Sequence, residues 1–218
     1  MTDILVATRN THKVAEIRGI LAGSVRLLSQ NDVPGAPAVA EEAATFAGNA
    51  ARKADGLAAW LEAHPQAAPM GAPFYVLADD SGLEVDALGG APGVHSARFA
   101  AADASGTANA SDAANNAKLL RLLAGVPSER RTARFRCVLA LAARRQATLL
   151  FEGHCEGRIA LAAAGAGGFG YDPLFVPDGC AQSFAELGED VKNKISHRAR
   201  ALAQLRRFLH DLARGAGL

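Results

Sequence analysis

Two adjacent carboxylates, Asp79 and Asp80, follow a short apolar and aromatic run at positions 74–77 and precede Ser81 and Gly82. The run is typical of a buried strand, and we expect the strand to end at the acids and lead into a glycine turn. Successive side chains of a strand point to opposite faces, so the two acids should have different roles. The position suits metal-dependent chemistry, and the alternative is an ordinary Asx-type turn.

A polar segment lies between a predicted strand at 4–7 and a predicted helix at 13–21. It consists of Thr8, Arg9, Asn10, Thr11, His12 and Lys13. A strand-to-helix junction directs backbone N–H groups and the helix dipole toward an anion, and a lysine adds a point charge for phosphate. The segment lacks the pattern of a Walker A loop. The alternative is a polar helix cap with a solvated lysine.

A second acidic pair, Glu41 and Glu42, precedes a predicted alanine-rich helix over 45–62 that Thr45 should cap. Acids before a helix commonly do no more than complement its dipole. Together with Asp80, however, one of them could supply the oxygen ligands that Mg²⁺ prefers. The spacing leaves both interpretations open.

The glycine-rich segment 165–170 satisfies the spacing GxGxxG. A dinucleotide-binding turn must open a helix, whereas Pro173 biases the residue before it away from helical geometry. We therefore reject a Rossmann motif and predict a turn that presents Phe169, Tyr171 and Asp172. An aromatic ring beside a carboxylate suits a nucleobase and its sugar, and the alternative is that the rings pack into the core.

A donor-rich segment introduces the C-terminal helix, which Ser196 should cap. We place Lys192, His197 and Arg198 at this loop-to-helix junction. The predicted apolar face of the helix comprises Ile195, Ala199, Leu202, Leu205, Leu209 and Leu212. The other arginines of this basic tail should lie on its solvated face: Arg200, Arg206, Arg207 and Arg214.

Strand-like and helix-like segments alternate along the chain, which indicates an α/β fold with a mixed twisted central sheet flanked by helices. We further expect a helix over 113–123 and two strands over 134–142 and 148–153, paired antiparallel across a turn at 144–146. The proline-rich stretch 64–73 should be a connector, and 103–111 a polar loop.

The composition of the 218 residues limits the possible functions. Half of them are hydrophobic, and the net charge is +1, which gives no global attraction to nucleic acid or to membrane surfaces. No apolar run reaches the length of a membrane span, and the N-terminus lacks a signal-peptide pattern. The three cysteines, Cys137, Cys155 and Cys180, show no paired spacing, so we expect a reducing, cytoplasmic environment.

These motifs together resemble the inosine triphosphate pyrophosphatase family, which cleaves noncanonical purine nucleoside triphosphates to monophosphate and pyrophosphate. The resemblance spans nearly the whole chain. Its most specific parts are Thr8-x-Asn10-x-x-Lys13-x-x-Glu16, the segments 79–83 and 88–94, the segment 169–173, and Lys192 with Ser196-His197-Arg198. It implies a single domain over 1–218, built of two lobes with the active site in the cleft between them, and a homodimer.

The resemblance also implies roles for the phosphate and metal residues. Residues 8–13 would hold the triphosphate, Asp80 would be the general base and a metal ligand, and Glu41 would be the second carboxylate on Mg²⁺. Ser81 would touch the nucleotide. This chain has Ala43 and Ala44 where the family usually has a glycine, so the choice of Glu41 over Glu42 needs structural support.

The base-binding roles that the resemblance implies fall on the C-terminal motifs. The base and ribose would be framed by Phe169, Gly170, Tyr171 and Asp172. The purine would be contacted by Lys192, His197 and Arg198. Gly48 stands where family members often carry an acid, and the connector 64–73 is longer than usual, as expected of a surface insertion.

Three other functions fit the sequence less well. A Maf-like nucleotide pyrophosphatase would share the fold, but its usual Ser-Pro-Arg-Arg run is absent from the first loop. A catalytically silent nucleotide-binding module would be expected to lose an essential acid, and all four are present. A nucleic-acid-binding protein would need a broader basic face with interleaved aromatic residues.

Overall fold

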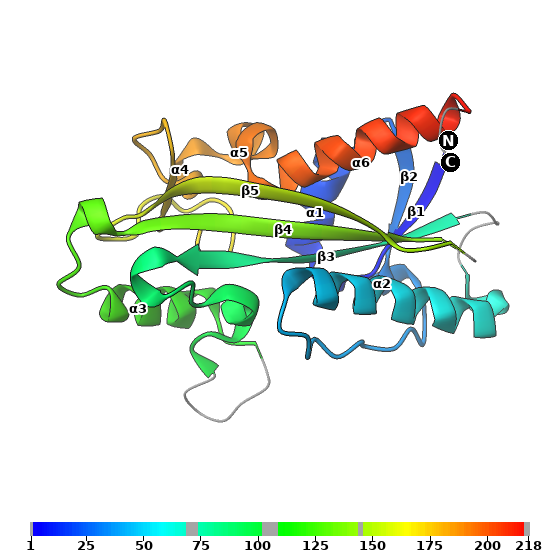
Figure 1. Ribbon diagram of the computed structural model, residues 1–218, viewed down its shortest axis with the longest axis horizontal. Helices are drawn as coiled ribbons and strands as arrows, with labels where there is room; N and C mark the ends of the chain where they lie inside the picture. The colour runs from blue at the N-terminus through cyan, green and yellow to red at the C-terminus, as the bar shows by residue number, and fades with distance from the viewer. Residues whose placement is uncertain (1, 69–73, 102–108, 144–145, 216–218) are drawn as a thin grey trace. The chain divides into compact units, whose positions relative to one another are not determined.

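The protein is an α/β protein built on a six-stranded mixed sheet, and the computed structural model describes residues 2–68, 74–101, 109–143 and 146–215. The strand order is β2-β1-β3-β4-β5-β6. The pairs β1–β2 and β1–β3 are parallel, whereas β5–β6 is antiparallel. The strands are β1 (Thr2–Val6), β2 (Val25–Ser29), β3 (Phe74–Val85), β4 (Thr132–Ala142), β5 (Leu149–Ile159) and β6 (Phe175–Pro177). Figure 1 labels the helices, which are α1 (Thr11–Ile20), α2 (Phe46–Ala63), α3 (Asp112–Leu122), α4 (Phe184–Leu187), α5 (Glu189–Ile195) and α6 (His197–Ala213).

The chain divides into two compact units. The first unit comprises residues 1–80, 137–153 and 198–218, and the second comprises 81–136 and 154–197. Strands β3, β4 and β5 each contribute residues to both units.

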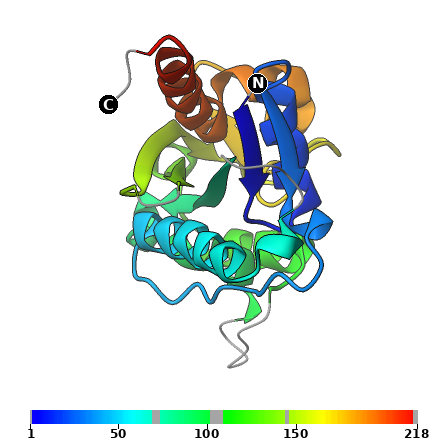
Figure 2. The ribbon, with the colours of Figure 1, turned by 90° about the vertical axis from the view of Figure 1, so that its right-hand side faces the viewer.

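In the first unit, α6 and α2 lie on opposite sides of β1 and β2 (Figures 1 and 2). The apolar stripe of α6 packs into a core with α1 and the strands. This core includes Ile4, Val6, Ile17, Leu77, Leu139, Leu202 and Leu205. The predicted apolar face of α6 is therefore confirmed for Leu202, Leu205 and Leu209, whereas Ile195 lies in α5 and belongs to the other core. The four arginines predicted on the other side of the helix are exposed.

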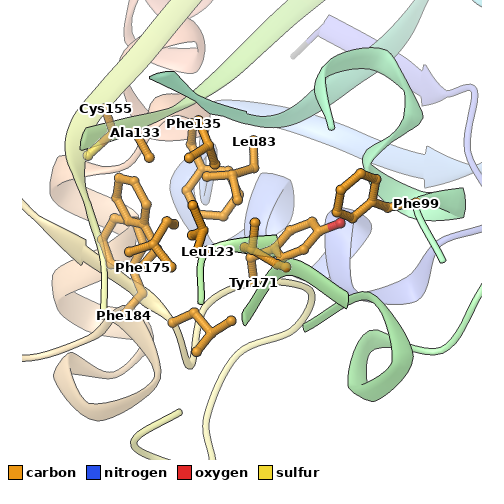
Figure 3. Close-up of a cluster of buried hydrophobic side chains, with 13 residues drawn as sticks. Leu83, Phe99, Leu123, Ala133, Phe135, Cys155, Tyr171, Phe175 and Phe184 are labelled. Atoms are coloured by element: carbon orange, nitrogen blue, oxygen red, sulfur yellow. The ribbon is translucent and has the colours of Figure 1, made fainter. Parts of the chain in front are cut away.

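The second unit has a core rich in aromatic side chains (Figure 3). Its buried members include Leu83, Phe99, Leu123, Phe135, Tyr171, Phe175 and Phe184. The ring centroids of Phe135 and Phe175 lie 4.7 Å apart, and those of Phe175 and Phe184 lie 5.4 Å apart. Contacts of this kind add to the stabilisation from apolar burial.

Local signals correctly predicted most of the long elements. Thr45 caps α2 by accepting a hydrogen bond from the Gly48 N–H, and Asn10 caps α1. Five elements differ from expectation. Strand β3 continues through the acid pair to Val85, and β2, β6, α4 and α5 were not predicted. They are short, so hydrophobic periodicity carries little information about them.

Parts of three predicted connections lie outside the described residues: 69–73 of the connector, 102–108 of the polar loop and 144–145 of the turn between β4 and β5. Strands β4 and β5 are neighbours in the sheet, as expected. Within the described part of the chain, no helix is long and apolar enough to cross a membrane.

Candidate functional site

The acid pair lies within β3 rather than at its end, which corrects the sequence-based prediction. After the pair the side chains alternate between buried and partly exposed positions, as expected of a strand: Leu83 and Val85 are fully buried, and Glu84 is only partly buried. Asp79 and Asp80 are 1% and 5% exposed. A strand can hold two such acids in its interior only if each is paired, and each has its own set of partners in the first unit.

Asp79 is held by two cations. Its Oδ1 lies 2.6 Å from the Lys13 Nζ, and its Oδ2 accepts from the Arg198 Nε at 2.9 Å. The Cys137 thiol also donates to Oδ2 at 3.2 Å. Burial alone would raise the pKa of Asp79, but Arg198 and Lys13 outweigh it and hold that pKa well below its usual range. Asp79 is therefore a permanent carboxylate that positions Lys13.

Arg198 is the first residue of the first unit after the crossover at 197–198, and its guanidinium is fully buried. Besides Asp79, it bonds the carboxylate of Glu16 in α1. The resemblance placed Arg198 at the purine, and that role stays a prediction. The contacts of Arg198 with Asp79 and Glu16 neutralise both carboxylates.

Asp80 has partners on α2. Its Oδ2 accepts from the Asn49 Nδ2 at 3.2 Å, and its Oδ1 lies 3.0 Å from the Lys53 Nζ. Burial, reinforced by the nearby Glu41, raises the pKa of Asp80 although Lys53 and Lys13 lower it. The two adjacent acids therefore have opposite pKa shifts, and Asp80 is the one suited to accept a proton.

Lys53 joins Asp80 to Glu41. Its Nζ lies 2.9 Å from the Glu41 Oε1, and it also donates to the backbone carbonyl of Asp79 at 2.8 Å. Burial would lower the pKa of Lys53, but Asp80 and Glu41 reverse the effect and raise it, so the ammonium stays charged. Glu42 pairs instead with Arg52 at 3.6 Å, and its side chain is 72% exposed. The geometry thus favours Glu41 over Glu42 as the functional acid.

The Glu41–Asp80 pair fits a divalent cation. An ammonium between the two carboxylates stands where positive charge is required, and their oxygens are the hard donors that Mg²⁺ binds together with substrate phosphate and water. Among the described residues, no group of three or more His, Cys, Asp or Glu side chains could hold a metal alone. A cation bound here would need further oxygens from outside the protein side chains.

The loop before α1 has the features of a helix cap. The Asn10 Oδ1 accepts from the N–H groups of His12 and Lys13 at 3.0 and 3.1 Å, so these donors are occupied rather than free for an anion. Thr8 accepts from the Asn10 N–H, and the Arg9 guanidinium donates to the Ala36 carbonyl at 2.6 Å. Thr11 begins the helix and is exposed. Phosphate binding by this loop would rest mainly on its side chains.

In the second unit, Asp172 organises the glycine-rich turn. It bonds the Lys192 Nζ, and its Oδ2 accepts from the Phe169 N–H at 2.9 Å. The same ammonium lies 4.5 Å from the centre of the Phe169 ring. No helix follows the turn before α4, which confirms that the GxGxxG spacing is not a dinucleotide-binding motif. The motif 169–172 and Lys192 are thus brought together.

Tyr171 does not project from this turn as predicted. Its ring is 4% exposed and belongs to the aromatic core (Figure 3), and its hydroxyl donates to the Ser96 carbonyl at 2.8 Å. The turn reverses direction at Gly170, whose φ is +63°, so Phe169 and Tyr171 have different surroundings. Tyr171 supports the site as a buried anchor.

Three further predicted residues lie within regular elements, and all three belong to the second unit. Lys192 is in α5 and is buried, so its predicted place at a loop-to-helix junction is wrong, because α5 was not foreseen. His197 begins α6, as expected, and its ring stacks on Phe135 with centroids 4.7 Å apart. Ser81 lies in β3 directly after Asp80 and is partly buried.

Four residues of the first unit were missed as site residues. They are Glu16, Asn49, Lys53 and Cys137. A signal did exist for three of them, because Glu16 also belongs to the motif that begins at Thr8. Asn49 and Lys53 are spaced by four residues on the buried face of α2, among Phe46, Ala50 and Leu57, and polar residues on an apolar helical stripe must be satisfied by a specific partner.

Most of the chain is similar to known proteins. Residues 4–208 match the model of the Ham1 family. The chain is 49% identical to a dITP/XTP pyrophosphatase of Opitutus terrae, over 92% of this chain and 95% of that protein. It is 47% identical to one from Geobacillus kaustophilus, over 100% and 98%.

Solved structures give the same result. The Ham1 protein of Staphylococcus aureus is 34% identical and aligns with a TM-score of 0.80, over 97% of this chain and 100% of that one. A nucleoside-triphosphatase, dITP/XTP pyrophosphatase, of Mycobacterium abscessus is 42% identical, with a TM-score of 0.68 over 94% and 98% of the two chains.

Proposed function

Because the chain belongs to the Ham1 family, we propose that it hydrolyses the noncanonical purine nucleoside triphosphates dITP, XTP and ITP to the nucleoside monophosphate and pyrophosphate. The observation that carries the proposal is the Glu41–Lys53–Asp80 cluster. It combines a carboxylate pair suited to a divalent cation with an acid whose pKa is raised. Removing such nucleotides from the precursor pool is the activity that this chemistry serves.

In the proposed mechanism, water attacks the α-phosphorus and the bond to the bridging oxygen of pyrophosphate breaks. Asp80 aligns the water and takes its proton, for which a raised pKa brings the carboxylate nearer to the working pH. A Mg²⁺ bound by Glu41 and Asp80 would neutralise charge on the triphosphate and on the leaving group. Lys13, held in place by Asp79, adds a fixed positive charge for the phosphates.

Lys53 has a supporting role in this scheme. Its contacts with Glu41, Asp80 and the Asp79 carbonyl hold the two proposed metal ligands together before substrate binds. Without that ammonium, the buried Asp80 carboxylate and the partly exposed Glu41 carboxylate would repel each other, which would raise the pKa of Asp80 further.

Base recognition is assigned to the second unit. The Phe169 ring offers a stacking surface, and Asp172, Lys192 and His197 offer polar contacts to the purine and ribose. Hypoxanthine and xanthine present a carbonyl acceptor at the purine 6-position, where adenine presents an amino donor. A site built from donors rejects adenine, because its own polar groups would be left unpaired.

The remaining features of the proposal come from the resemblance. We propose that residues 1–218 act as one nucleotide-hydrolysing domain with two lobes and a cleft active site, that Mg²⁺ is the cofactor, and that the protein is a cytoplasmic homodimer. Cys137 and Cys155 are buried as thiols, which fits a reducing compartment. Light scattering during size-exclusion chromatography tests the dimer, and a mass equal to one chain would exclude it.

The test of the activity is pyrophosphate release with Mg²⁺ from ITP, dITP and XTP compared with ATP, GTP and dTTP. We expect the first three to be preferred and the Asp80→Asn variant to lose at least about 100-fold in kcat. Asp178→Asn, at an exposed aspartate, is the matched control and should retain wild-type rates. Activity on ATP equal to that on ITP would refute the proposed specificity, and a fully active Asp80→Asn variant would refute the proposed base.

A further inference from the structure

Helix α3 holds both peptide groups of Gly170 in the glycine-rich turn. The Asp112 Oδ2 accepts a hydrogen bond from the Gly170 N–H at 2.7 Å, and the Asn116 Nδ2 donates to the Gly170 carbonyl at 2.9 Å. Asp112 and Asn116 are four residues apart, so both side chains lie on the same face of α3. We call these two residues and their contacts with Gly170 the α3 clamp.

The clamp acts on a glycine that has open space where a side chain would lie. Gly170 has φ +63°, and a Cβ added there would meet nothing within 4 Å. No atom therefore packs on the side of Gly170 where a Cβ would lie, and the two hydrogen bonds to α3 constrain its peptide groups. The Asp112 side chain is exposed, but its hydrogen bond from the Gly170 N–H is short, as expected when the acceptor is a charged carboxylate.

The chemistry of Asn116 also indicates a specific purpose. Its Oδ1 is buried and has no hydrogen-bond partner in the part of the chain that the structure describes. An unsatisfied buried acceptor is unfavourable, and an apolar side chain of similar size would avoid that cost. The hydrogen bond that Nδ2 donates to the Gly170 carbonyl is the interaction that an apolar side chain could not make.

Helix α3 is itself rigidly anchored in the second unit. Asn115 accepts from the Ala100 N–H at 2.8 Å and donates to the Ala97 carbonyl, while Lys118 donates to the Phe99 carbonyl at 2.7 Å. Leu119 lies in the aromatic core. A clamp on such a helix transmits a fixed geometry to the turn.

We infer that Asp112 and Asn116 are positioning residues for purine recognition, which set the orientation of Phe169 through Gly170. This inference rests on the proposed function. Gly170 directly follows Phe169, whose N–H is bound to Asp172 and whose ring faces the Lys192 ammonium. The clamp and Asp172 thus fix the turn on both sides of the Phe169 carbonyl. Loss of the α3 clamp should weaken binding of the base, while the phosphate-binding and metal-binding residues of the first unit keep their contacts.

The experiment uses the full-length protein and compares Asp112→Ala and Asn116→Leu with the conservative variant Asp112→Asn. The Asn116→Leu side chain keeps the volume but removes the donor, whereas an asparagine at 112 can still accept from the Gly170 N–H. Ala117→Gly is the control, because it weakens α3 at an exposed position and leaves both clamp contacts in place. Thermal unfolding of each variant is recorded in parallel.

The expected result is a split between kinetic constants. Asp112→Ala and Asn116→Leu should each raise the KM for ITP by about tenfold or more with kcat changed less than threefold, and should weaken binding of IMP equally. Asp112→Asn should recover most of the binding, and Ala117→Gly should keep the wild-type KM. Binding of inorganic triphosphate, which lacks a base, should be the same in all variants.

The outcomes separate the two claims. Wild-type protein without activity on ITP would overturn the proposed function and the clamp with it. An active wild type whose clamp variants keep the KM for ITP would overturn the clamp alone. A loss that Ala117→Gly reproduces, or that lowers kcat and triphosphate binding as much as IMP binding, would assign the clamp residues to fold stability and also overturn the inference.

Discussion

Replacing Arg198 by methionine should destabilise the protein severely. Methionine keeps most of the length and apolar volume of the side chain but removes the charge. In the native protein the Arg198 guanidinium bonds both oxygens of Asp79, at 2.9 and 3.3 Å, and also the Glu16 carboxylate. The side chains of Asp79 and Glu16 are 0% and 9% exposed, so solvent cannot replace the lost partner.

The magnitude follows from this burial. Removing one partner of a buried ion pair costs about 3–5 kcal/mol, because the remaining charge is left without compensation. Lys13 still contacts the Asp79 Oδ1, which keeps the expected loss within that range although two acids are affected. The control is Arg206→Met, at an exposed arginine of the same helix, which should change stability by no more than about 0.5 kcal/mol.

Urea unfolding followed by fluorescence of Trp60, the single tryptophan, measures the effect. At an m-value of about 3 kcal/mol/M or less, the midpoint should fall by about 1 M or more. Adding Asp79→Asn to Arg198→Met should recover part of the loss, because the orphaned charge is removed. A loss of unfolding free energy below about 1 kcal/mol in Arg198→Met would refute the reasoning. So would purely additive losses, in which Asp79→Asn destabilises Arg198→Met as much as it destabilises the wild type.

Four shorter predictions concern the site and its supports. Gly168→Ala would place a Cβ 2.1 Å from the Asp172 Oδ2 at φ +72° and should raise the KM for ITP at least about tenfold, whereas Gly179→Ala, at φ +81° with open space, should not. Burial, and to a lesser extent Asp112, raise the pKa of Tyr171. The folded state therefore keeps this proton, while the unfolded state loses it above about pH 10. Between about pH 9.5 and 11 the free energy of unfolding should fall less steeply in Tyr171→Phe than in the wild type. Glu41→Gln should raise the Mg²⁺ concentration needed for half-maximal rate about tenfold or more. An equal increase in Glu42→Gln would refute the choice of Glu41 over Glu42 as the metal ligand. Chelation by EDTA should abolish hydrolysis and added Mg²⁺ should restore it, while activity that persists in EDTA would exclude metal dependence.

The sequence predicted the fold to the extent that its signals were local. The Thr45 cap, the apolar periodicity of α6 and the helix predicted over 113–123 are encoded within a few residues, and each is confirmed. The length of β3 was not predictable in this way. Two adjacent acids before a glycine resemble a turn until their partners are known, and the partner that keeps Asp79 inside the strand, Arg198, is 119 residues away.

The candidate site shows the same division. Opposite environments for Asp79 and Asp80 follow from strand alternation alone, and the structure confirms that their partners differ. The choice between Glu41 and Glu42 required the position of Lys53. The clamp on Gly170 joins residues 58 apart in the chain, so no local pattern could have indicated it.

The most direct test of the central claim is the identity of the products formed from ITP with Mg²⁺ by the wild-type protein and by Asp80→Asn. Separation of the nucleotides by ion-exchange chromatography, with a parallel assay for pyrophosphate, distinguishes the two possible cleavage sites. We predict IMP and pyrophosphate in equal amounts from the wild type, and at least about 100-fold less of both from Asp80→Asn. Formation of IDP and inorganic phosphate, or undiminished IMP formation by Asp80→Asn, would contradict the account.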